Sequence, residues 1–233
     1  MPLQTLLHLA PRIALHPLAA LPLLVAASWP AHAQIGCRSD GQPAPTALFE
    51  RFLSADCDTC WSDPRTPAPG PSALLLDWIA PSPQGDDAPL AAAAMVETTA
   101  RLQALDRSSP TPTAVHVTAL EHRGPQALRV VHGLPVAGYL GVMLEWRGRP
   151  LPPGAYRSTM ALVEHLSAGT EGAGVARVLV RAATTADWDG RRPLKDLRGM
   201  RVPEGAQAAR LGVAGWVQDA EGRLVAAARA HCE

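Results

Sequence analysis

The 233-residue chain carries 21 basic and 21 acidic side chains, so its formal net charge at neutral pH is zero. No basic patch stands out along the sequence, which argues against nucleic acid as a partner. A chain of this length has room for one or two domains, at roughly 100 to 200 residues per domain.

The first 33 residues predict a secretory signal peptide. They hold one charged side chain, Arg12, then an apolar stretch, and they end on Ala31-His32-Ala33, the small-x-small pattern that signal peptidase cleaves. A membrane anchor is the alternative, but Pro17 and Pro22 interrupt a stretch already short of the ~20 apolar residues of a span. We therefore expect a periplasmic or secreted protein with no transmembrane span after cleavage.

All four cysteines of the chain follow the predicted cleavage site. An even number of cysteines in an exported chain favours disulfides over free thiols. Three pairings are possible for four cysteines. We expect Cys57 to pair with Cys60 and Cys37 with Cys232, because the termini of a domain often lie near each other.

The region 34–112 has a mixed α/β pattern. The apolar runs at 46–53 and 72–79 predict two strands, and the run at 90–105, rich in Ala, Leu, Met and Arg, predicts a helix. Between the two strands, prolines crowd the segment 62–72, which favours an extended loop.

The region 113–233 predicts antiparallel β structure. Short runs, several with alternating apolar and polar residues, are separated by Gly and Pro, and they lie at 113–121, 126–133, 138–147, 158–166 and 175–185. The segment 211–232 predicts a hairpin that turns at 219–222. The predicted fold class is therefore α/β plus β: a divergent thioredoxin-like half at 34–112, followed by an antiparallel, sandwich-like half at 113–233.

The placement of Cys57 and Cys60 suggests redox chemistry. A strand that runs into Cys-x-x-Cys, followed by a second strand and a helix, is how a thioredoxin-like fold begins. We expect Cys57 to be the attacking thiol, Cys60 the resolving thiol, and the partner a protein thiol or disulfide.

Two segments carry a family resemblance. LFERFLSADCDTCWSDP resembles the opening of a family of secreted bacterial thioredoxin-like proteins catalogued as a domain of unknown function, in which a VELFTSxGCSSCPPAD-type segment is typical. AGWVQDAEGRLVAAA and Trp188-Asp189-Gly190 are similar to the β-rich tail of that family. The resemblance implies that Cys57 and Cys60 are the motif cysteines. Trp61 and Ser62 replace the paired prolines that follow them in the family.

The thioredoxin-like resemblance also implies a cis-proline loop that faces the dithiol. Thr111-Pro112-Thr113 stands directly before a predicted strand, so Pro112 is the candidate for this position.

Other features of the sequence argue against a reactive dithiol. A helix N-terminus or a nearby cation would favour a thiolate, but the prolines argue against a helix immediately after Cys60. Asp56, Asp58 and Asp63 would raise the pKa of a nearby thiol, whereas Arg51 and Arg65 would lower it if they lay close to the thiol. The alternative is a non-enzymatic binding or structural module in which both bridges only hold the fold. The sequence leaves enzymatic activity open.

The remaining candidates are weaker. Trp61 and Trp78 are expected to line a surface cleft, because one lies beside the dithiol and the other at a strand end. The histidines lack the spacing of a metal site, and no phosphate-binding glycine loop is present, so we expect neither a metal nor a cofactor.

Overall fold

The computed structural model describes residues 36–120 and 126–232. They belong to one compact unit, 34–233. The predicted signal peptide, 1–33, lies outside the described residues. None of the helices in the described part of the chain has the length and apolarity that a membrane crossing requires.

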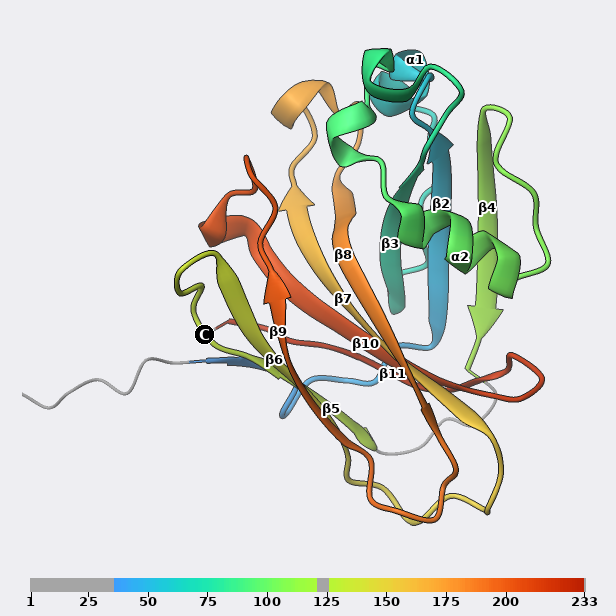
Figure 1. Ribbon diagram of the computed structural model, residues 1–233, viewed down its shortest axis with the longest axis vertical. Coiled ribbons are helices and arrows are strands. Elements are labelled where there is room, and N and C mark those ends of the chain that lie inside the picture. Colours follow the sequence, from blue (N-terminus) through green and yellow to red (C-terminus); the bar gives the residue numbers. More distant parts are fainter. Residues whose placement is uncertain (1–35, 121–125, 233) are drawn as a thin grey trace, which may run out of the picture. The chain divides into compact units, whose positions relative to one another are not determined.

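Most of the chain forms two β-sheets (Figure 1). The seven-stranded sheet has the order β11 (Leu224–Arg229), β10 (Leu211–Asp219), β7 (Tyr156–Leu166), β8 (Arg177–Trp188), β3 (Ala73–Ala80), β2 (Ala47–Ser54) and β4 (Thr113–Ala119). The four-stranded sheet has the order β1 (Cys37–Arg38), β5 (Leu128–His132), β6 (Tyr139–Trp146) and β9 (Lys195–Arg201).

The larger sheet is mixed. β3 runs parallel to both β2 and β8, whereas the other neighbours in this sheet are antiparallel. The β2–β3 ladder is eight residues long, but β3 and β8 share a single register pair, Asp77 with Leu179. The β3–β8 junction is therefore the thinnest backbone connection in this sheet.

The mostly β architecture with few helices and a mixed sheet agrees with the predicted fold class in its coarse features. The predicted strands are confirmed, with bounds that differ by a few residues. β4 pairs with β2, so one sheet runs across residue 112, where the sequence suggested a change of region. The prediction missed β1 and β9; β9 buries only Met200, which leaves little apolar pattern to recognise.

The predicted helix at 90–105 is shorter than expected. The helix α2 spans Val96–Ala104, and the preceding alanines form a 3-10 turn, η2 (Ala91–Ala93). Tertiary contacts override helix propensity here, because Ala94 forms a β-bridge with Ile79 and the Met95 amide donates to the Ile79 carbonyl at 3.2 Å. Three further 3-10 turns are η1 (Gly85–Asp87), η3 (Thr170–Gly172) and η4 (Ala208–Arg210).

The expectation of no helix around Cys60 is wrong. The single-turn helix α1 spans Asp58–Ser62, with Cys57 at its N-cap. The turn ends at Asp63, directly before Pro64, so the proline-rich segment limits the length of this helix but does not prevent it.

Two apolar clusters cover opposite faces of the larger sheet. Leu102 of α2 packs with Phe52, Trp78 and Trp216 on one face, and Figure 1 shows α2 lying across β2, β3 and β4. The second cluster joins residues of β5 and β6 to residues of β7, β10 and β11. At Gly215 of β10 the two sheets approach so closely that a Cβ atom would lie 2.7 Å from Leu144 Cδ1. Strand β10 is consequently buried on both faces.

The predicted terminal bridge is present. Cys37 and Cys232 form a disulfide across a sequence separation of 195 residues. Beside it, Arg38 and His231 form a β-bridge, and β1 pairs with β5. The bridge therefore fastens both ends of the described chain to the four-stranded sheet.

We expect the double variant Cys37→Ser/Cys232→Ser to lose about 5 kcal/mol of unfolding free energy, because the bridge closes a loop of nearly 200 residues in the unfolded chain. This corresponds to a fall in Tm of roughly 10 to 20 °C in a protein of this size. The control Cys57→Ser/Cys60→Ser opens a loop of only three residues' separation and should lose about 2 kcal/mol. Thermal unfolding measures both, and equal losses would contradict the loop-closure argument.

Candidate functional site

Cys57 and Cys60 form a disulfide directly after the carboxyl end of β2. Both residues are partly exposed, whereas Trp61, the next residue in α1, is buried. The Cys57 amide donates to the Ser54 carbonyl at 3.0 Å, and the Cys60 amide lies 3.2 Å from both the carbonyl oxygen and the Sγ of Cys57. The bridge therefore sits on a hydrogen-bonded turn at the edge of the sheet, within reach of solvent.

Pro112 lies next to the same strand end. The Thr111–Pro112 peptide bond is cis, and β4 begins at the following residue. The Ser54 amide, three residues before Cys57, donates to the Pro112 carbonyl at 2.9 Å. The backbone thus brings the expected cis-proline segment and the cysteine turn to the same end of β2.

A buried carboxylate, Asp77, connects the three strands below this turn. Arg51 of β2 donates to it through Nε at 2.6 Å and through Nη2 at 2.8 Å, which is a bidentate pair. On the other side, Arg177 of β8 donates from Nη1 at 3.2 Å and the Val178 amide donates at 2.8 Å. Asp77 and Arg177 side chains have no exposed surface, and Arg51 is 4% exposed. Asp77 therefore supplies side-chain hydrogen bonds where the β3–β8 ladder has only one register pair.

Arg177 connects this network to the cysteine turn. Its Nη2 donates to the carbonyl oxygens of Cys60 at 3.0 Å and Trp61 at 2.8 Å, and to the Thr66 hydroxyl at 3.2 Å. The guanidinium also lies over the Trp61 ring, 5.0 Å from its centroid. The last carbonyls of a helix have no partner within the helix. Arg177 therefore supplies a donor to the Cys60 carbonyl and one of two donors to the Trp61 carbonyl.

Arg177 stays charged although its side chain is fully buried. Burial lowers the pKa of its guanidinium, and the nearby carboxylate of Asp77 partly offsets this effect. An arginine nevertheless stays protonated in proteins. Two guanidiniums and one carboxylate give the group formed by Arg51, Asp77 and Arg177 a formal charge of +1.

A loop from the β-rich region covers the outer side of α1. The Trp61 indole donates to the Glu171 carbonyl at 2.8 Å, and the Gly174 amide donates to the Trp61 carbonyl at 3.1 Å. A Cβ atom at Gly174 would lie 2.1 Å from the Ser62 carbonyl oxygen, so only glycine allows this approach. The cysteine turn is thus held from below by Arg177 and from the side by this loop.

Of the acidic residues near the cysteines, Asp63 is paired and Asp56 has a buried carboxylate oxygen. Asp63 accepts from the Arg65 side chain, and this hydrogen bond holds the pKa of the Asp63 carboxyl below its usual value. Asp56 Oδ1 is buried and has no hydrogen-bond partner within the described ranges 36–120 and 126–232. The expected influence of three acids on the dithiol is therefore weakened at Asp63, which is paired.

The expectation that Trp61 and Trp78 line a surface cleft is wrong. Trp61 is 6% exposed and packs with Leu53, Ile79 and other apolar side chains beneath α1. Trp78 is 1% exposed, stacks on Phe52 and donates from its indole to Glu50 at 3.1 Å. Both indole N–H groups have acceptors within the protein, so these large side chains lie in the interior without an unpaired donor.

A second buried ion pair lies on the opposite face of β2. Glu50 accepts two hydrogen bonds from Arg101 of α2, at 2.8 and 2.6 Å. Arg101 donates further to Gln218 of β10 at 2.8 Å and lies 5.4 Å from the Trp216 ring centroid. Successive residues of a strand face opposite sides, so Glu50 and Arg51 fasten β2 to different neighbours.

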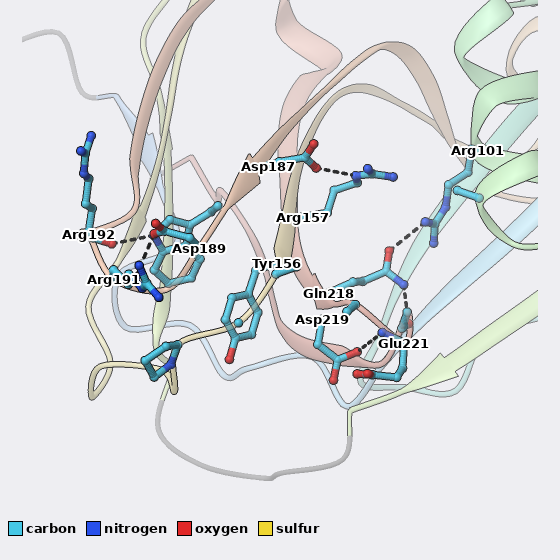
Figure 2. A pocket seen from close by; sticks show the side chains of 17 residues that line it. Arg101, Tyr156, Arg157, Asp187, Asp189, Arg191, Arg192, Gln218, Asp219 and Glu221 are labelled. Carbon is cyan, nitrogen blue, oxygen red and sulfur yellow. Dashed lines mark hydrogen bonds and ion pairs between the residues drawn. The ribbon is translucent and has the colours of Figure 1, made fainter.

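A hollow of about 1190 Å³ begins at Arg101 and Gln218 (Figure 2). It extends along the β10–β11 turn and the adjoining ends of β7 and β8, where Arg157 pairs with Asp187 at 2.9 Å. Tyr156 pairs with Trp188 at this end of the β7–β8 ladder, whereas Leu166 pairs with Arg177 at the end beneath the cysteines. The ten steps between them span roughly 30 Å, so the hollow and the disulfide lie at opposite ends of these strands.

Sequence reasoning missed the central role of Asp77 and Arg177. Asp77 interrupts the apolar run LLLDWI, and Arg177 opens the run RVLV. A charged residue within a buried strand requires a partner, and this was the available signal.

Within the described part of the chain, neither Cys57 nor Cys60 belongs to a group of three or more His, Cys, Asp or Glu side chains placed to hold a metal ion.

We expect Asp77→Asn to lower the unfolding free energy by about 3 to 5 kcal/mol, because it leaves two buried guanidiniums without a counter-charge. The matched control is Asp63→Asn, whose partner Arg65 has an 88% exposed side chain, and its effect should be much smaller. Urea unfolding of both variants tests this. Two similar, small changes would show that Asp77 does not hold the sheet together.

Comparisons with known proteins bear on the fold alone. No protein-family model matches the chain, and no curated protein matches it in sequence. Among solved structures, the chain is similar to HBP35 of Porphyromonas gingivalis, with a TM-score of 0.51 and 11% sequence identity, over 81% of this chain and 76% of that one. It is also similar to protein AGR_C_4864 from Agrobacterium tumefaciens, with a TM-score of 0.45 and 16% identity, over 81% of this chain and 95% of that one.

Proposed function

We propose that the chain is an exported, periplasmic or secreted protein that exchanges thiols and disulfides with a protein partner through Cys57 and Cys60. The observation that carries this proposal is a partly exposed disulfide at the carboxyl end of β2, on a turn whose backbone is fixed from beneath by Arg177. The two disulfides also support export, because such bridges persist in oxidising compartments.

The arrangement of elements around the cysteines supports a thioredoxin-like role. A strand leads into the motif, a parallel strand and a helix follow, and Pro112 precedes an antiparallel strand on the other side of β2. This is the order expected from the resemblance to the secreted thioredoxin-like family. Cys57 is the attacking residue in this proposal and Cys60 the resolving one.

Two features would stabilise a thiolate at Cys57. The Cys60 amide lies 3.2 Å from Cys57 Sγ and can donate a hydrogen bond to the anion. The group formed by Arg51, Asp77 and Arg177 places a net positive charge beneath the turn, with Arg177 bonded to the Cys60 carbonyl. Both effects favour the charged form of the thiol.

The exchange step conserves electrons and protons between the two proteins. The Cys57 thiolate attacks a partner disulfide, a mixed disulfide forms, and one partner sulfur leaves as a thiolate. The Cys60 thiolate then attacks Cys57 Sγ, which restores the Cys57–Cys60 bridge and releases the second partner sulfur. Two electrons pass to the partner. The oxidised chain accepts two electrons from a partner dithiol by the reverse steps.

A non-enzymatic module is the second candidate. A hollow of about 1190 Å³ lies far from the cysteines, at the other end of β7 and β8. In this alternative both bridges only stabilise the fold, and the β-rich region binds a partner.

A redox titration distinguishes the two candidates. The mature protein is equilibrated with glutathione buffers of graded potential, and alkylation followed by peptide mapping reports each cysteine pair separately. We expect Cys57–Cys60 to titrate between about −270 and −120 mV, the range of exchange proteins, and Cys37–Cys232 to lie at a more negative potential. The terminal bridge serves as the internal control in the same sample.

A Cys57–Cys60 bridge that glutathione does not reduce would contradict the exchange proposal. If Cys57–Cys60 resists glutathione and its potential lies below about −300 mV, as for structural bridges, the non-enzymatic candidate is favoured.

A further inference from the structure

Cys37, His132 and Cys232 lie together at the edge of the four-stranded sheet. One possible ligand atom from each residue, the two sulfurs and a ring nitrogen, lies within 4.8 Å of the other two. Cys37 and His132 are directly opposed in the β1–β5 ladder, and Cys232 follows the β-bridge between Arg38 and His231. Three separate segments of backbone therefore fix this cluster.

One ring nitrogen of His132 is buried and has no use in the hydrogen bonding of the described residues. The residue is 4% exposed, and its Nδ1 lies 2.9 Å from the Gly133 carbonyl oxygen. Because a carbonyl oxygen only accepts, Nδ1 carries the proton, and Nε2 is left with a free lone pair. Nε2 is buried and has no hydrogen-bond partner in the part of the chain that the structure describes. A buried polar atom without a partner requires an explanation.

The hydrogen bond at Nδ1 gives His132 the tautomer that a metal ligand requires. Histidines that bind metals commonly donate their second ring N–H to a carbonyl or carboxylate, which fixes the tautomer and the ring orientation. The bond from His132 Nδ1 to the Gly133 carbonyl has this form.

We propose that Cys37, His132 and Cys232 form a redox-controlled site for a thiophilic cation such as Zn²⁺, which binds when the terminal bridge is reduced. Two thiolates and one imidazole are a donor set that Zn²⁺ accepts, with a fourth position left for water or another ligand. Cys37 and His132 are buried, whereas Cys232 is exposed. A cation can therefore reach the site from solvent on the Cys232 side.

The disulfide bond and the pair of metal-bound thiolates are alternative states of the same two sulfur atoms. A dithiol reductant transfers two electrons and two protons to the Cys37–Cys232 bond and is itself oxidised to a disulfide. Binding of Zn²⁺ then releases the two thiol protons, because the thiolate is the ligand. A disulfide oxidant takes two electrons from the two thiolates and two protons from solvent and becomes a dithiol; the Cys37–Cys232 bond forms again and the cation is released.

The experiment uses the variant Cys57→Ser/Cys60→Ser, which leaves Cys37 and Cys232 as the only cysteines of the chain. The protein is reduced with excess dithiothreitol, freed of reductant without oxygen, and titrated with Zn²⁺ against a chromogenic chelator. Co²⁺ replaces Zn²⁺ in a parallel titration to reveal thiolate-to-cobalt charge-transfer absorption. We expect one equivalent bound in the reduced form and none in the oxidised form.

His132→Ala in the same background tests the nitrogen ligand. We expect its affinity for Zn²⁺ to fall at least about tenfold, since even changes beyond the ligands themselves cost about 10- to 100-fold in metal affinity. The control variant His116→Ala removes a partly buried histidine on β4 of the larger sheet. This variant should bind Zn²⁺ as its parent does.

Thermal unfolding of the reduced protein with and without Zn²⁺ separates a folded site from thiols in an unfolded chain. A rise in Tm that His132→Ala abolishes supports the site. Equal binding by the His132→Ala and His116→Ala variants would overturn the proposal, as would a reduced protein that neither binds Zn²⁺ nor gains stability from it.

Discussion

The carboxylate of Asp77 is the constraint on which the described structure depends. It stands on β3 at the thinnest backbone junction of the sheet, between β3 and β8, and it accepts hydrogen bonds from both neighbouring strands. Arg177 then connects β8 to the cysteine turn, because its guanidinium donates to two carbonyls of that turn at once. A buried charge network thus replaces the missing ladder and positions the disulfide.

A second network of buried polar side chains connects β2 to its neighbours on the other face of the strand. Glu50 and Arg101 join the strand to α2, and Gln218 continues the connection to β10. The two networks come from adjacent residues of one strand, and they fasten the α/β elements to the β-rich elements on both faces. They also lead to different surfaces: one to the disulfide, the other to the open hollow at the far end of β7 and β8.

The sequence was sufficient to predict the described strands other than β1 and β9, both disulfide pairings and the placement of Pro112 before β4. Local patterns failed where distant contacts decide the local structure. Ala91 to Ala94 have high helix propensity, but the first three form a 3-10 turn and Ala94 forms a β-bridge with Ile79. The two tryptophans expected at a cleft instead donate to Glu171 and Glu50 from the interior. Asp77 pairs with arginines 26 and 100 residues away, and residue spacing in the sequence does not predict such distant partners. A charged residue within an apolar strand indicates only that some partner exists.

Amide hydrogen exchange in the variant Arg177→Met tests the central role of the buried network most directly. The substitution keeps a long apolar side chain but removes the donors to Cys60 and Trp61. The account predicts faster exchange confined to α1, the proline-rich loop and the loop at 170–176, with the β10–β11 hairpin protected as in the parent. Unchanged exchange at α1, or a uniform increase over the whole chain, would contradict it.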